Sequence, residues 1–107
     1  MAEISQACRE MGEATSLQER TQADTRFHLA ILRASGNELL VPLGVLIEST
    51  LNHLFVYVTR DESSIRHAQT LHEAIEKSIR LQRPDAARKA VRKLLANTDE
   101  IILRGPR

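Results

Sequence analysis

The chain has 107 residues, and 15 Lys plus Arg against 14 Asp plus Glu leave a formal net charge of +1. This length predicts one small domain, and the balanced charge argues against a protein that holds DNA by electrostatics alone. Aromatic residues make up 3% of the chain and Trp is absent, which excludes RNA modules that stack bases on aromatic rings. The single cysteine, Cys8, favours a reducing, cytoplasmic location because it can form no intramolecular disulfide.

The N-terminal residues carry charge and include no secretory signal. The longest nearly apolar run, residues 39–47, is interrupted by Pro42 and Gly44 and is too short to span a membrane. We therefore expect a soluble protein with no membrane partner.

Helical spacing of apolar residues extends through the chain and predicts an all-α bundle of about five helices. The first four are predicted over residues 2–14, 17–34, 42–59 and 65–81, and the last follows a turn at Arg83-Pro84-Asp85. The Ser35-Gly36-Asn37 segment supplies the stop after the second helix, and Asp61-Glu62-Ser63-Ser64 supplies a polar break and cap before the fourth. The helix over 42–59 is apolar on two sides, which predicts a homodimer.

Polar residues embedded in the apolar stripes are the candidates for chemistry. Asp24 and His28 are four residues apart on one helix face, and His72 interrupts the apolar stripe of the fourth helix. A carboxylate and two imidazoles that converge inside a bundle would suit a divalent transition metal. The alternative is structural, with Asp24 paired locally to Arg20 or His28 and with His72 a hydrogen-bonded core histidine.

Two separated motifs resemble one family. The first is Asp24-Thr25-Arg26-Phe27-His28, followed by Ala34-Ser35-Gly36-Asn37 and Leu39-Leu40. The second is Leu71-His72-Glu73-Ala74-Ile75, followed by Ala86-Ala87-Arg88-Lys89-Ala90 and Leu94-Leu95. Together they resemble the FCD domain, the effector-binding domain of FadR-type regulators in the GntR family, over essentially the whole chain. The resemblance implies an antiparallel helical bundle that binds a small organic acid, such as a sugar acid, often through a divalent metal.

The resemblance carries the metal-ligand role to Asp24, His28 and His72, and it places Leu94 where the family has a fourth ligand, a histidine. A zinc-like or nickel-like ion with three protein ligands would keep an open position for water or an effector oxygen. A metal-free member of the family is the alternative. Thr50 and His53, on a polar-tipped stripe of the third predicted helix, are candidates for the effector pocket, and a hydrogen-bonded core or interface pair is the other interpretation.

On the same resemblance, the family's N-terminal winged helix and first effector-domain helix are expected to lack a counterpart in these 107 residues. Residues 1–107 are therefore expected to form a single effector-binding and dimerisation domain that acts on DNA only through a separate winged-helix domain. We expect no enzymatic activity. The alternatives are a metal-dependent hydrolase and a phosphotransfer bundle with His72 as the acceptor, and the second requires that His72 face solvent.

Overall fold

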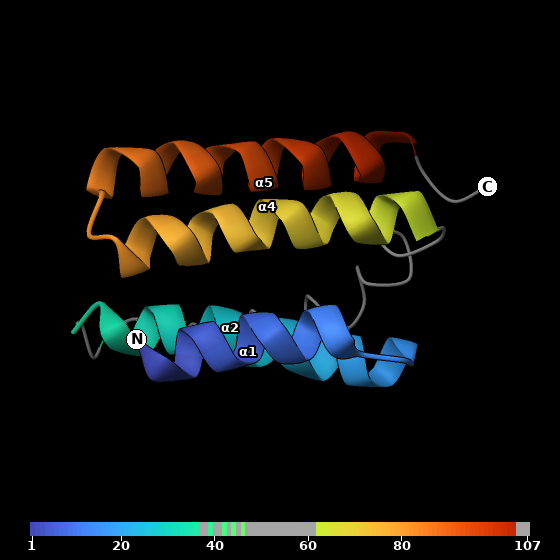
Figure 1. Cartoon of the computed structure of the whole chain (residues 1–107). Helices are drawn as coiled ribbons and strands as arrows, with labels where there is room; N and C mark the ends of the chain where they lie inside the picture. Colours follow the sequence, from blue (N-terminus) through green and yellow to red (C-terminus); the bar gives the residue numbers. More distant parts are fainter. Residues whose placement is uncertain (37–38, 40–41, 43, 45, 47–61, 105–107) are drawn as a thin grey trace. The chain divides into compact units, whose positions relative to one another are not determined.

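A computed structural model describes residues 1–36, 39, 42, 44, 46 and 62–104. These residues contain four helices and no strand, which confirms the prediction of an all-α fold. The helices are α1 (Ala2–Glu13), α2 (Leu17–Ala34), α4 (Glu62–Arg80) and α5 (Pro84–Arg104), shown in Figure 1. The chain divides into two compact units, Met1–Phe55 and Val56–Arg107.

In the first unit, α1 packs against α2, and a connection of only three residues makes the two helices antiparallel neighbours. Each helix buries its apolar stripe in this contact. Phe27 is fully buried at the centre of the α2 stripe. The other buried apolar residues of the pair are Ile4, Ala7, Cys8, Met11, Ala23 and Ala30. Cys8 is a free cysteine and is buried, as is usual for a thiol that serves as a small apolar packing residue.

The start of α2 is fixed by side-chain caps. Ser16 has an extended backbone, and its hydroxyl accepts a hydrogen bond from the Glu19 N–H at 3.1 Å. The Glu19 carboxylate accepts in turn from the Thr15 N–H at 3.2 Å. Arg20 donates to the Ala14 carbonyl at 3.2 Å, just after the end of α1. These bonds satisfy backbone groups that a helix end leaves open, so the three connecting residues hold a defined turn.

A Ser16→Ala variant should lower the free energy of unfolding by about 1 kcal/mol, because it removes the acceptor of the Glu19 N–H. Urea denaturation followed by circular dichroism measures this loss. Ser16→Asp is the matched control, since it keeps a capping oxygen and should retain most of the stability. Equal stability of the alanine and aspartate variants would contradict the role of the cap.

The second unit is the α4–α5 pair, in which Leu71, Ile75 and Leu94 are buried. Its connection is residues 81–83, with Gln82 at φ 55°, in the left-handed region. The predicted turn at Arg83-Pro84-Asp85 is wrong by about two residues: Pro84 is the first residue of α5, a position where its missing N–H costs no hydrogen bond.

The helix α4 begins at Glu62, so Ser63 and Ser64 lie within its first turn. Asp61, the first residue of the predicted break and cap, lies outside the described residues. In the first unit, by contrast, Gly36 has φ +75° after the end of α2, as the Ser35-Gly36-Asn37 stop signal predicts.

Most of the third predicted helix, 42–59, lies outside the described residues. Pro42, Gly44 and Leu46 are described and have helical backbone. Gly44 is buried, and a Cβ added there would overlap the Leu29 side chain of α2, so a glycine permits the close approach. No helix in the described part of the chain is long and apolar enough to cross a membrane.

Candidate metal and effector site

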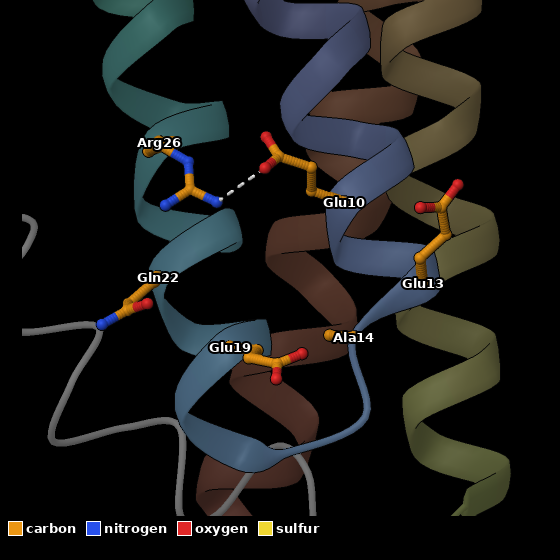
Figure 2. Close-up of a pocket in the computed structure, with 6 residues that line it drawn as sticks. All are labelled: Glu10, Glu13, Ala14, Glu19, Gln22 and Arg26. Atoms are coloured by element: carbon orange, nitrogen blue, oxygen red, sulfur yellow. Dashed lines mark hydrogen bonds and ion pairs between the residues drawn. The ribbon is translucent and has the colours of Figure 1, made fainter.

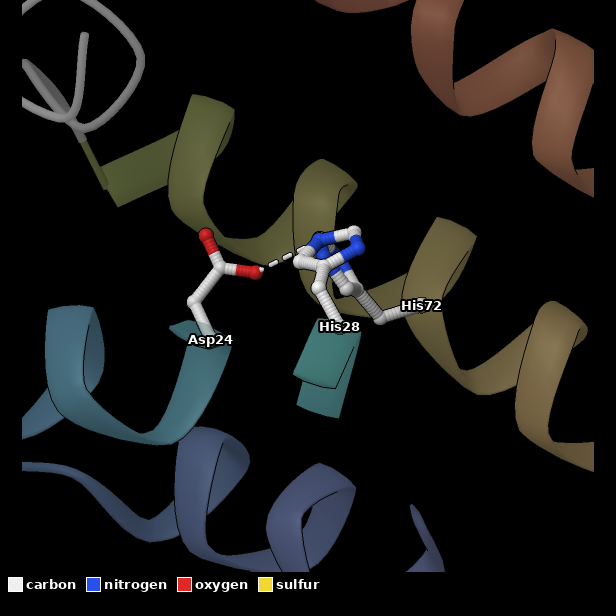
Figure 3. A group of neighbouring side chains, drawn as sticks. All are labelled: Asp24, His28 and His72. Atoms are coloured by element: carbon white, nitrogen blue, oxygen red, sulfur yellow. Dashed lines mark ion pairs between the residues drawn. The ribbon is translucent and has the colours of Figure 1, made fainter. Parts of the chain in front are cut away.

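The first half of the candidate site is a carboxylate and an imidazole on α2. The i, i+4 spacing brings the Nε2 of His28 to 3.0 Å from an Oδ1 of Asp24, as Figure 3 shows. Asp24 is 7% exposed, although a carboxylate in an α-helix usually faces water. Of the two local partners considered for Asp24, the structure has His28, while Arg20 binds the Ala14 carbonyl.

This spacing also suits metal binding. When two ligand atoms each lie about 2.0–2.2 Å from one tetrahedral zinc ion, they are separated by about 3.3–3.6 Å. The Nε2 of His28 and the Oδ1 of Asp24 are 3.0 Å apart, so a small movement of either side chain would bring them to that separation. The ring of Phe27 lies edge-on to the His28 ring, with centroids 5.4 Å apart, so a buried aromatic residue borders the imidazole.

The second half is His72 on α4. Its side chain is buried, with 5% of the residue exposed, and its Nδ1 lies 2.7 Å from the Ala68 carbonyl oxygen. A carbonyl oxygen only accepts, so Nδ1 carries a proton, and in a neutral imidazole with that tautomer the lone pair lies on Nε2. This is the arrangement in which a histidine binds a metal through Nε2 while a backbone carbonyl fixes its ring. Burial of His72 argues against the phosphotransfer alternative, which needs a solvent-facing histidine.

A surface pocket of about 310 Å³ lies elsewhere on the first unit, shown in Figure 2. An ion pair between Arg26 and Glu10, 3.4 Å long, borders it. Arg26 is two residues from both Asp24 and His28 and therefore lies on the opposite face of α2. This pocket is separate from the candidate metal ligands. Its other lining residues are Glu13, Ala14, Glu19 and Gln22.

Comparison with known protein families identifies the family of the chain. The family model for the FCD domain matches residues 1–97. The chain belongs to the FCD-domain family. FCD domains are the effector-binding domains of FadR/GntR-type regulators, a family of transcription regulators and not of enzymes. A search of the curated proteins and a search of the solved structures found no significant match.

This FCD domain is thus a ligand-sensing regulatory domain of the GntR type. Leu94, which stands where the resemblance expects a fourth ligand, lies on α5 and is buried, with 6% of the residue exposed. Its side chain contributes no donor atom. The two effector-pocket candidates, Thr50 and His53, lie outside the described residues.

One polar residue of the FCD domain was not among the predicted site residues. Asn97 on α5 has a fully buried Nδ2 with no hydrogen-bond partner. Its sequence signal is an amide three residues after Leu94, on the apolar face of the last helix. By contrast, His67, Arg88 and Arg92 are exposed, as their positions on the helices predict.

Proposed function

We propose that the chain is the sensor and dimerisation domain of a GntR/FadR-type regulator and that it binds a small organic acid through a divalent metal ion. The proposed ligands of the metal are Asp24, His28 and His72, the three side chains labelled in Figure 3. The observation that carries the proposal is the Asp24–His28 pair, whose two ligand atoms lie 3.0 Å apart on one helix face and are therefore close enough to share one metal ion.

The chemistry of the donor set supports the metal. Each of the three residues offers one ligand atom, an imidazole nitrogen or a carboxylate oxygen, and this set suits zinc and nickel. The Ala68 carbonyl fixes the ring of His72, and the same bond leaves Nε2 as the coordinating atom. When bound, the metal supplies a Lewis acid that holds a carboxylate oxygen of the effector.

Leu94 sets the number of protein ligands in this proposal. A leucine side chain offers an apolar wall in place of a fourth donor, so the metal would keep a position for water or for the effector. A sugar acid or a similar small carboxylate is the proposed occupant of that position.

A Leu94→His variant should tighten zinc binding by about tenfold or more, because it adds an imidazole where the family has a fourth ligand. Competition titration with a chromogenic zinc chelator measures the change. Leu94→Met is the matched control, since it keeps the apolar volume without adding an imidazole. A histidine variant with the affinity of the methionine variant would contradict the proposed place of α5 beside the metal.

The broader proposal is tested by metal analysis of the purified chain together with a thermal-shift screen of organic acids. Metal should copurify in stoichiometric amount, and a carboxylate effector should raise the melting temperature of the metal-loaded protein more than that of the chelator-treated protein. Absence of bound metal after zinc addition, or equal shifts in both states, would refute metal-assisted binding.

We further propose that the domain works in the cytoplasm as a homodimer and that a separate winged-helix domain recognises the operator. Sedimentation should give a dimer at micromolar concentration. The described helices provide no turn and wing with a recognition helix, so this chain alone should show no sequence-selective DNA shift in a gel assay. A clean monomer would refute the dimer.

A further inference from the structure

The second unit carries a strongly basic surface that the proposed metal site does not use. Residues 77–98, from the last turn of α4 into α5, contain seven Lys and Arg residues and one acidic residue, so this segment carries +6 while the whole chain carries +1. Such a separation of charge along a chain is typical of a surface that binds a polyanion. The seven residues of this basic face are all exposed: Lys77, Arg80, Arg83, Arg88, Lys89, Arg92 and Lys93.

Most of the basic face is not neutralised by nearby carboxylates. Arg80 pairs with Glu76 at 3.0 Å, and Arg88 pairs with Asp85 at 2.6 Å. In the described part of the chain, the side chains of the other five basic residues form no ion pair. Neighbouring charges of one sign repel each other, so a bound anion would relieve this repulsion.

Three of the unpaired cations lie close together on α5. Lys89 is three residues from Arg92 and four from Lys93, a spacing that makes their side chains neighbours on the helix surface. From Pro84 to Lys93 the helix rises about 14 Å. Duplex DNA carries one negative charge for about every 1.7 Å of its axis, so a surface of this length faces several phosphate groups.

We propose that the basic face contacts the phosphate backbone of duplex DNA and adds salt-sensitive, sequence-independent affinity to the regulator. Phosphate contacts position a protein on a duplex and carry no sequence information. Operator recognition stays with the separate winged-helix domain, so the inference goes beyond the proposed function and rests on it only for the choice of DNA.

An anionic membrane is a different polyanion and fits this face less well. A helix that lies in a membrane interface buries its apolar side among the lipids. The apolar side of α5, which includes the buried Leu94, already packs against α4. The basic face can therefore offer charge to a partner but no free apolar side of this helix for insertion.

Fluorescence anisotropy of a labelled duplex tests the inference on the full chain. The wild type should bind two unrelated sequences equally at about 50 mM salt and much more weakly at about 200 mM. In Lys89→Gln/Arg92→Gln/Lys93→Gln, affinity at low salt should fall about tenfold or more, and the slope of log affinity against log salt should flatten by about one for each lost contact. Circular dichroism and zinc affinity should not change, since the three side chains are exposed.

The matched control is Arg9→Gln/Arg26→Gln/Arg33→Gln, which removes three exposed charges from the first unit. Arg26 and Arg33 already pair with glutamates of α1, so this variant should keep the DNA affinity and the salt slope. Equal losses in the two triple variants would overturn the inference, because the attraction would then follow net charge alone.

Two further results would overturn the inference: a wild type that binds no duplex at low salt, and tighter binding to phosphatidylserine vesicles than to the duplex. Both leave the proposed metal and effector binding standing. A strong preference of the wild type for one of the two unrelated sequences would instead count against the separate winged-helix domain of the proposed function.

Discussion

A Phe27→Ala variant is expected to lose about 3–5 kcal/mol of unfolding free energy, the range for truncation of a buried phenylalanine. Phe27 is 0% exposed, so the substitution leaves a cavity that neighbouring side chains fill only in part. For a domain of this size the loss is a large share of the total stability. Urea denaturation followed by circular dichroism measures it.

Phe27→Leu is the graded control for this variant and should lose clearly less stability, because it keeps an apolar side chain in the contact. The exposed residue Leu17 provides a second reference, since Leu17→Ala removes little buried area. If Phe27→Ala and Leu17→Ala were equally stable, burial of Phe27 would not contribute to the stability of the fold as expected.

His72→Ala is expected to weaken zinc binding by more than about 100-fold, because it removes one of only three proposed protein ligands. Changes to groups that merely orient a ligand already cost about 10–100-fold in metal affinity. Asp24→Asn should also weaken binding, since it replaces an anionic oxygen with a neutral amide of the same shape. Competition with a zinc chelator gives the affinities, and circular dichroism checks that the helices persist.

The chain offers its own control for His72. His67 lies on the same helix and is exposed, so His67→Ala removes an imidazole without touching the proposed ligand set. This variant should bind zinc like the wild type. If His67→Ala and His72→Ala lost zinc affinity equally, the binding would come from surface histidines and the proposed ligand set would be wrong.

The helices with strong local signals were predicted closely from the sequence. The predicted bounds of α2 agree with the structure, Leu17–Ala34, and its end was signalled by Ser35-Gly36-Asn37, in which Gly36 has a positive φ. The α4–α5 turn was misplaced because its left-handed residue is Gln82, a type that rarely adopts positive φ. The predicted turn was centred on Pro84 because proline often marks a turn, but proline also fits the first turn of a helix.

In the candidate site, too, the sequence predicted what depends on local spacing and did not predict what depends on the surroundings in space. The i, i+4 spacing on a helix is a local property, so the sequence could predict that Asp24 and His28 share a face. Burial of His72 followed from the apolar residues around it in the sequence. The open Nδ2 of Asn97 depends instead on which groups surround it in space, and no spacing rule reports whether a partner is within reach. The joint role of Asp24, His28 and His72 stays a prediction.

The short connections within each helix pair have a consequence for how the chain folds. Only residues 14–16 join α1 to α2, and only residues 81–83 join α4 to α5. Each pair thus forms its interhelical contacts after closing a small loop, which costs little chain entropy. Chains dominated by such local contacts reach their native state in microseconds to milliseconds, so each pair should complete its folding early, within a short stretch of newly exposed polypeptide.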